Sequence, residues 1–100
     1  IAVLGDMLEL GNLTTAEHHR IGRMAAYKAD ILLTYGPQSM HTLRGALTGG
    51  MSQRSAMNFG TKEELLNVLK NRARPGDVLL FKGSHGMHME EVLKAFMQEE

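Results

Sequence analysis

The segment FKGSHGMHMEE, residues 81–91, places one Lys, one Ser and two His among glycines directly after an apolar run. Glycine amides ahead of a helix, with a Lys beside them, are one way in which proteins bind phosphate or carboxylate groups. In a Walker A loop the Lys is followed directly by Ser or Thr at the end of the glycine loop. Lys82 instead precedes the glycines, so the segment predicts an anion-binding bend of another type.

The same segment offers a second chemistry, because His85, His88 and Glu91 are spaced three residues apart and would share one face of a helix. Gly86 disfavours a helix across His85, and the absence of Cys removes thiolate metal sites and disulfides. We therefore expect no metal site in this chain. The other histidines are expected at the surface or at the edges of elements: His18, His19 and His41.

Short apolar runs alternate with helical stripes along the chain. The runs predict strands at residues 1–4, 31–35 and 78–81, with a weaker one at 55–59, because strands covered on both faces are apolar along their length. Four helices are expected in the intervening and final segments from apolar residues spaced three and four apart. These inward-facing residues are Ile21, Met24, Ala25, Met40, Leu43, Leu47, Leu65, Leu66, Leu69, Met89, Val92, Leu93, Phe96 and Met97.

Helix starts are indicated by residues that can satisfy the free amides of a first turn. Thr14 with Glu17, and Thr61 with Glu64, have the spacing of a capping box. Pro37 stands at a plausible first helical position, where its missing N–H has no partner to lose.

Repeated strand–helix units with short connections predict a small three-layer α/β domain, with a mainly parallel sheet of about four strands and right-handed crossovers. In such sheets, ligands bind beyond the carboxyl ends of the strands. Four polar loops fall there: GDMLELG, YGPQS, GTKEE and KGSHG. One edge of the sheet is therefore the predicted site.

Asp6 directly follows the first predicted strand. A carboxylate at this position can bind a ribose hydroxyl or a cation, and it can equally cap nearby backbone amides. The sequence leaves both roles open.

Composition limits the class of protein. One hundred residues with 43% hydrophobic content fit one domain, and 11 basic residues balance 11 acidic ones. No net charge attracts nucleic acid or an anionic membrane, and no apolar run approaches the roughly 20 residues of a spanning helix. We expect a soluble, intracellular and monomeric chain, with no nucleic-acid partner and no membrane insertion.

Four segments, IAVLGDMLELG, EHHRIGRMAA, ADILLTYGP and RPGDVLLFKGSHGMHMEEVL, resemble in order and spacing the C-terminal domain of the Mur ligase family. The resemblance covers nearly the whole chain. GDMLELG and KGSxGMxMEEV are specific to the branch of the family that uses D-Ala-D-Ala. The sequence departs from the pattern at His85 and His88, where basic residues such as Arg are expected.

The resemblance implies a Rossmann-like domain, residues 1–100, of a three-domain cytoplasmic enzyme of peptidoglycan precursor synthesis. The domain would be N-terminally truncated and lack its opening strand and helix. The full-length ligase would add D-Ala-D-Ala to UDP-MurNAc-tripeptide through an acyl phosphate, with ATP and Mg²⁺ bound mainly by domains absent here. The isolated chain would hold no catalytic residue and be inactive.

The resemblance also distributes the site residues between two sides of the predicted edge. Those assigned to the nucleotide and the acyl phosphate are Asp6, Met7 and Glu9. Backbone amides, a hydroxyl and an ammonium group can bind the carboxylate of the dipeptide. The residues assigned to the dipeptide are Tyr35, Gly36, Lys82, Gly83, Ser84 and His85. These residues would position the substrates as the domain closes over the rest of the enzyme, and would not transfer protons themselves.

Two other classes use the same edge. A phosphate-accepting receiver-like switch would place Asp6 and Lys82 at strand ends, but the middle strand ends in Tyr35 instead of an acceptor Asp. A non-catalytic ligand-binding α/β module would use the edge without chemistry.

Overall fold

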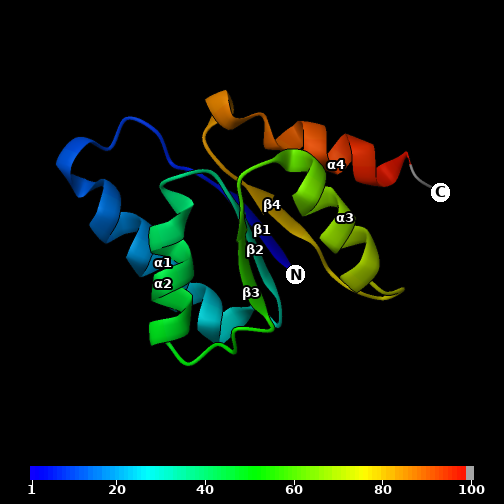
Figure 1. The fold of residues 1–100 in the computed structure, drawn as a ribbon, viewed down its shortest axis with the longest axis horizontal. Coiled ribbons are helices and arrows are strands. Elements are labelled where there is room, and N and C mark those ends of the chain that lie inside the picture. The colour runs from blue at the N-terminus through cyan, green and yellow to red at the C-terminus, as the bar shows by residue number, and fades with distance from the viewer. Residues whose placement is uncertain (99–100) are drawn as a thin grey trace.

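The computed structural model describes residues 1–98 (Figure 1). The strands are β1 (Ala2–Gly5), β2 (Leu32–Tyr35), β3 (Ala56–Phe59) and β4 (Leu80–Lys82), and the helices are α1 (Thr14–Lys28), α2 (Ser39–Thr48), α3 (Lys62–Arg72) and α4 (Met89–Met97). Short 3-10 turns precede α1 at Gly11–Leu13 and α4 at His85–Met87. All four predicted strands are present, and each begins one or two residues later than predicted.

The four strands form one parallel sheet in the order β3-β2-β1-β4. Gly5 pairs with Tyr35 and Tyr35 with Phe59, so three strands end level at one edge. In Figure 1, α1 and α2 cover one face of the sheet, and α3 and α4 cover the other. The three-layer α/β architecture with a parallel sheet is therefore confirmed.

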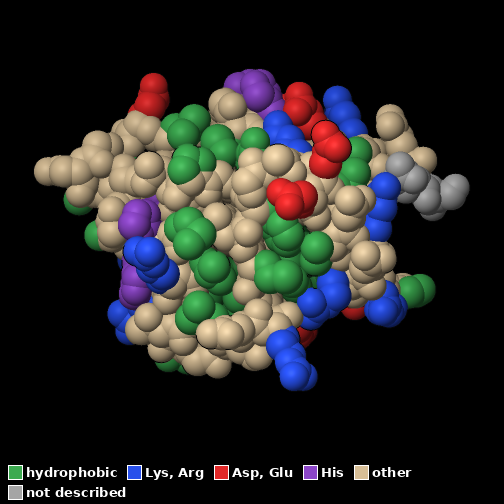
Figure 2. Space-filling view, in the orientation of Figure 1, with side chains coloured by type: hydrophobic (Ala, Val, Ile, Leu, Met, Phe, Trp, Pro, Cys, Tyr) green, Lys and Arg blue, Asp and Glu red, His purple; other side chains and the backbone are tan. Residues whose placement is uncertain are grey.

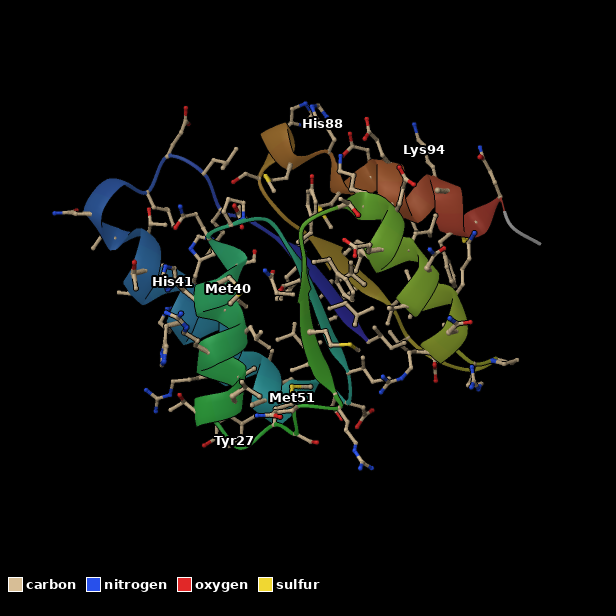
Figure 3. All side chains as sticks on the ribbon, viewed as in Figure 1. Tyr27, Met40, His41, Met51, His88 and Lys94 are labelled. Carbon is tan, nitrogen blue, oxygen red and sulfur yellow. The ribbon has the colours of Figure 1, made fainter. Side chains whose placement is uncertain are left out.

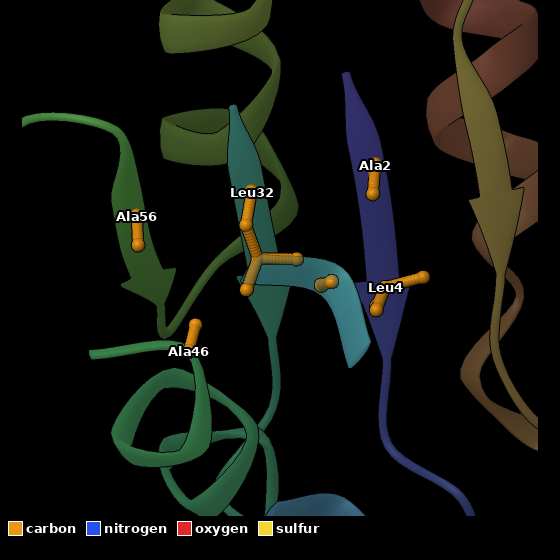
Figure 4. Packing of buried hydrophobic residues seen from close by; sticks show 6 residues of the cluster. Ala2, Leu4, Leu32, Ala46 and Ala56 are labelled. Carbon is orange, nitrogen blue, oxygen red and sulfur yellow. The ribbon is translucent and has the colours of Figure 1, made fainter. Parts of the chain in front are cut away.

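The two faces of the sheet are packed differently. Successive residues of a strand point to opposite faces. The core between the sheet and α1 and α2 holds many small side chains, as Figure 4 shows for Ala2 and Ala56 of the sheet and Ala46 of α2, beside the larger Leu4 and Leu32. The opposite face buries larger residues: Val3, Leu33, Leu65, Leu69, Met89 and Val92. Small side chains let α1 and α2 lie close to the sheet and to each other.

Two buried glycines bring α1 and α2 into backbone contact. A Cβ added to Gly22 would overlap the carbonyl oxygen of Thr42, and one added to Gly45 would overlap that of His19. Neither carbonyl can move without moving its helix. The pair α1–α2 is therefore a rigid unit on this face.

The predicted helix starts are partly wrong. Thr61 is the N-cap of α3, and its hydroxyl accepts from the Glu64 amide at 3.2 Å, as the capping box predicts. Thr14 caps nothing, since the chain enters α1 from a 3-10 turn in which Leu13 already has helical dihedral angles. Its hydroxyl donates to Gly11 O at 2.7 Å, and Glu17 pairs with Arg20 instead. α2 begins two residues after Pro37, not at it.

Several large apolar residues that were predicted to face inward are exposed, namely Met24 (43%), Met40 (39%), Leu93 (38%) and Met97 (58%). For Met24 and Met40 the reason is the backbone contact of α1 with α2 at Gly22 and Gly45, which places small or polar residues such as Thr42 and Ala46 on the buried side of α2. Leu93 and Met97 are on α4, whose buried residues are Met89 and Val92. Within residues 1–98, no helix combines the length and apolarity that crossing a membrane requires.

We expect Gly22→Ala to destabilise the protein. The overlap with Thr42 O costs about 1–3 kcal/mol or more, because backbone must shift, and it outweighs the roughly 1 kcal/mol that Ala gains over Gly in a helix. Urea unfolding should show a net loss of about 2 kcal/mol.

Gly60→Ala is the matched control, because a Cβ at Gly60 meets no atom within 4 Å. Its stability should stay within about 0.5 kcal/mol of the parent protein. Equal stability of the two variants would contradict the close contact of α1 with α2.

Candidate functional site

Four loops meet at the carboxyl edge of the sheet, as the sequence predicts. They follow β1, β2, β3 and β4, and three of them lead into α2, α3 and α4 through short connections. In Figure 3, His88 marks this edge, while Tyr27 and Met51 lie toward the opposite one. Figure 2 shows acidic, basic and His side chains interspersed along this edge on the face in view.

Asp6 lies at the centre of the edge and is 2% exposed. Its Oδ1 accepts from Ser39 N and Ser39 Oγ, both at 2.7 Å, and its Oδ2 accepts from Gln38 N at 3.1 Å. A carboxylate at this position satisfies the free amides of α2 and interacts favourably with the positive end of the helix. The side chain of Asp6 therefore caps α2, and its assignment to the nucleotide stays a prediction about its loop.

Gly36 is required by this arrangement. Its φ is +115°, and a Cβ would lie 2.5 Å from Cγ of Asp6. Its amide donates to Phe59 O at 3.2 Å, and Pro37 has no N–H. The next two amides are bound to Asp6, so the amides of Gly36, Gln38 and Ser39 are all engaged within the domain, and the assignment of Gly36 to the dipeptide stays a prediction.

Ser84 joins the loop after β4 to the loop after β1. Its Oγ accepts from Leu8 N at 2.7 Å, and its amide donates to Asp6 O at 3.0 Å. Gly83 lies against Gly5, since a Cβ on Gly83 would stand 3.3 Å from Gly5 Cα. The hydroxyl of Ser84 accepts one bond here and keeps its proton for donation to another partner.

Lys82 is exposed and, within residues 1–98, its ammonium group makes no hydrogen bond or ion pair. With Met7 and Ser84 it lines one end of a groove of about 830 Å³ between α1 and the strands β1 and β4, whose other end reaches Asp77 and Val78. The ammonium group is thus available to an anionic ligand at the carboxyl edge.

The two histidines of KGSHGMH are brought together without forming a metal site. His85 lies in the 3-10 turn and His88 has φ +52°, so α4 begins only at Met89. Their ring centroids are 5.9 Å apart, and His88 Nδ1 lies 3.4 Å from Glu90 Oε1. Among residues 1–98, no three His, Asp or Glu side chains are grouped to hold a metal ion.

Lys62 lies at the candidate edge and was not among the predicted site residues. Its Nζ lies 5.7 Å from the ring centroid of Tyr35 and 2.8 Å from Glu91 Oε1. The hydrogen bond from Lys62 lowers the pKa of Glu91. The polar loop GTKEE marked this position at the predicted edge, but the contact depends on α3 and α4 lying side by side.

His18 was predicted at the surface or at the edge of an element, and it is fully buried. Its Nε2 accepts from Met7 N at 3.0 Å, and its Nδ1 lies 2.7 Å from Thr14 O. A signal was present in the sequence, since His18, Gly22 and Ala25 have helical spacing and form the buried stripe of α1. The prediction followed the large apolar residues of α1 instead, and so missed this stripe.

Comparisons with known proteins agree with this geometry. The family model described as Mur ligase, glutamate ligase domain, matches residues 1–85. The UDP-N-acetylmuramoyl-tripeptide–D-alanyl-D-alanine ligase of Bacillus subtilis is 38% identical over 97 residues, which are 96% of this chain and 21% of the relative. That of Mycobacterium tuberculosis is 35% identical over 114 residues, covering 99% of this chain and 22% of the relative.

Solved structures give the same result. MurF from Acinetobacter baumannii superposes with a TM-score of 0.81 and 31% identity, over 99% of this chain and 22% of that one. MurF ligase from Thermotoga maritima in complex with ADP superposes with a TM-score of 0.78 and 27% identity, over 98% of this chain and 21% of that one. The chain thus spans about a fifth of the length of these relatives. The chain belongs to the Mur ligase family and corresponds to its glutamate ligase domain.

Proposed function

We propose that this chain is the C-terminal domain of a longer, three-domain cytoplasmic ligase that uses ATP to join D-Ala-D-Ala to UDP-MurNAc-tripeptide in cell-wall precursor synthesis. The names of the similar ligases support this substrate pair, and the complex of one relative with ADP supports the nucleotide. The isolated domain is proposed to be monomeric and inactive, since it would supply only one wall of the site.

The observation that carries the proposal is the direct bonding of the two motifs specific to these ligases. GDMLELG and KGSHGM are far apart in the sequence, yet Ser84 binds both Leu8 N and Asp6 O. A nucleotide-side loop and a dipeptide-side loop held together in this way would bring the acyl phosphate and the attacking amine to one place.

The proposed reaction proceeds in two steps. The terminal carboxylate of the tripeptide takes the γ-phosphoryl group of ATP and ADP leaves, and the amine of D-Ala-D-Ala then attacks the acyl carbon and displaces phosphate. The attacking nitrogen loses a proton to solvent or to a group outside this chain. Mg²⁺ would screen the phosphates when bound, and its ligands would come from the rest of the protein, since residues 1–98 offer no grouped set.

On the dipeptide side, Lys82 and Ser84 would receive the carboxylate of D-Ala-D-Ala. Lys82 supplies an unpaired ammonium and Ser84 a hydroxyl proton, both at the carboxyl edge. Such charge-assisted bonds are about twice as strong as neutral ones. Tyr35, Gly36, Gly83 and His85 would contribute shape around this pair, not further amides from the loop after β2.

On the nucleotide side, the loop after β1 would present Met7 and Glu9. Glu9 is exposed and has φ +63°, a conformation that costs free energy for a residue with a side chain. Asp6 would act through α2 and the loop backbone, because its carboxylate is already bound.

Assay of the full-length protein tests the function. We expect ADP and phosphate release that requires both UDP-MurNAc-tripeptide and D-Ala-D-Ala, with none from the chain alone. Binding of either substrate without turnover would contradict the ligase and favour a non-catalytic binding module.

We expect Lys82→Ala and Ser84→Ala, in the full-length protein, each to raise the KM for D-Ala-D-Ala by about tenfold, because each removes a bond to its carboxylate. The KM for ATP should change less than about twofold after Lys82→Ala. Steady-state kinetics with each substrate varied in turn would measure both constants.

Lys94→Ala is the control, because it removes an exposed Lys from the solvent side of α4 (Figure 3). It should leave both constants unchanged. An unaltered KM for D-Ala-D-Ala in the Lys82 and Ser84 variants would show that the dipeptide lies elsewhere.

A further inference from the structure

The buried imidazole of His18 has a fixed tautomer. Thr14 O can only accept, so the nitrogen 2.7 Å from it, Nδ1, must carry the proton. Met7 N–H can only donate, so Nε2, 3.0 Å away, must be the unprotonated acceptor. Both partners therefore select the same neutral form, with Nδ1 as donor and Nε2 as acceptor.

The Nε2 bond acts on the loop after β1. Two consecutive amides of this loop are held by side chains from different elements, Met7 N by His18 of α1 and Leu8 N by Ser84 of the loop after β4. The preceding carbonyl, Asp6 O, accepts from Ser84 N. The loop is thereby clamped from both sides immediately before its exposed part, Leu8 and Glu9.

The base of the clamp is rigid. His18 is followed one turn later by Gly22, where α1 touches the backbone of α2, and α2 is in turn capped by Asp6. Because α1 cannot rotate or withdraw without moving α2, the position of Nε2 is set by the packing of the two helices. The Met7 amide and the Asp6 carboxylate are thus both held by the same pair of helices, α1 and α2.

We propose that His18 is a positioning residue, which through its Nε2 bond to the Met7 amide holds the loop Asp6–Glu9 in the conformation that binds the nucleotide. The inference rests on the proposed function for the identity of the ligand, but the loop geometry stands without it. Thr14 O serves to keep the ring in the required tautomer.

Two substitutions of similar size separate positioning from packing. Gln can place its side-chain oxygen near the position of Nε2, and so keep an acceptor for Met7 N–H. Asn reaches only to the position of Nδ1, and so keeps a donor for Thr14 O and leaves Met7 N–H without its partner. Both variants are neutral and each loses one hydrogen bond, so both should melt at similar, lower temperatures.

Hydrogen–deuterium exchange of the full-length protein, read by mass spectrometry on peptides that cover residues 5–10, measures the clamp. We expect His18→Asn to speed exchange there by about tenfold, and His18→Gln to stay within about threefold of the parent. In the same variants the KM for ATP should rise at least about fivefold for Asn and less than about twofold for Gln. Equal exchange or equal KM values in the two variants would overturn the proposal.

A measurement on the unsubstituted protein remains decisive if a variant does not fold. The ¹⁵N shifts of His18, after selective His labelling of the full-length protein, should report a protonated Nδ1 and an unprotonated Nε2. The opposite tautomer would overturn the proposal. A full-length protein without ligase activity would refute the proposed function, while exchange and the ¹⁵N shifts would still decide whether His18 holds the loop.

Discussion

The carboxylate of Asp6 is the interaction on which the site depends. It ends β1 and caps α2 at the same time, through three bonds to Gln38 and Ser39, while almost completely shielded from water. A buried carboxylate is stable only with such bonds. The cap therefore fixes the carboxyl edge of β1 relative to the start of α2, and it requires a residue without a side chain at Gly36.

Close helix packing follows from the same arrangement. With α2 capped at the end of β1, α1 and α2 meet through Gly22 and Gly45, and Ala46 of α2 packs with Ala2 and Ala56 of the sheet. The methionines Met24 and Met40 lie outside this contact and are exposed, while Ile21, Leu43 and Leu47 pack beside it. On the opposite face α3 and α4 pack on larger residues and follow the ordinary hydrophobic pattern, except at the exposed Leu93 and Met97 of α4.

This difference explains what the sequence could and could not predict. Apolar runs located all four strands, and the Leu stripe of α3 and Met89 and Val92 of α4 were predicted inward correctly. In α1 and α2 the stripes were correct for Ala25, which is buried, and for Ile21, Leu43 and Leu47, which pack against the core, and wrong for Met24 and Met40, which are exposed. Periodicity of large residues did not detect the Gly, Thr and bonded His that are also buried in these helices. The polar edge was predicted from loop positions, whereas the bonds that Ser84, Lys62 and His18 make to other elements are tertiary. The helical spacing of His18, Gly22 and Ala25 indicates burial of His18 but not its partner.

The edge is divided between fixed backbone and available side chains. Asp6, Ser84 and His18 bind the loop backbones, so the Met7 and Leu8 amides and those of residues 36–39 other than Pro37 are already engaged. Lys82, by contrast, has an unpaired charge on the same edge within residues 1–98. Backbone amides that are already bound cannot donate to a ligand, so recognition at this edge would fall to side chains that keep an open donor, of which Lys82 is one within residues 1–98.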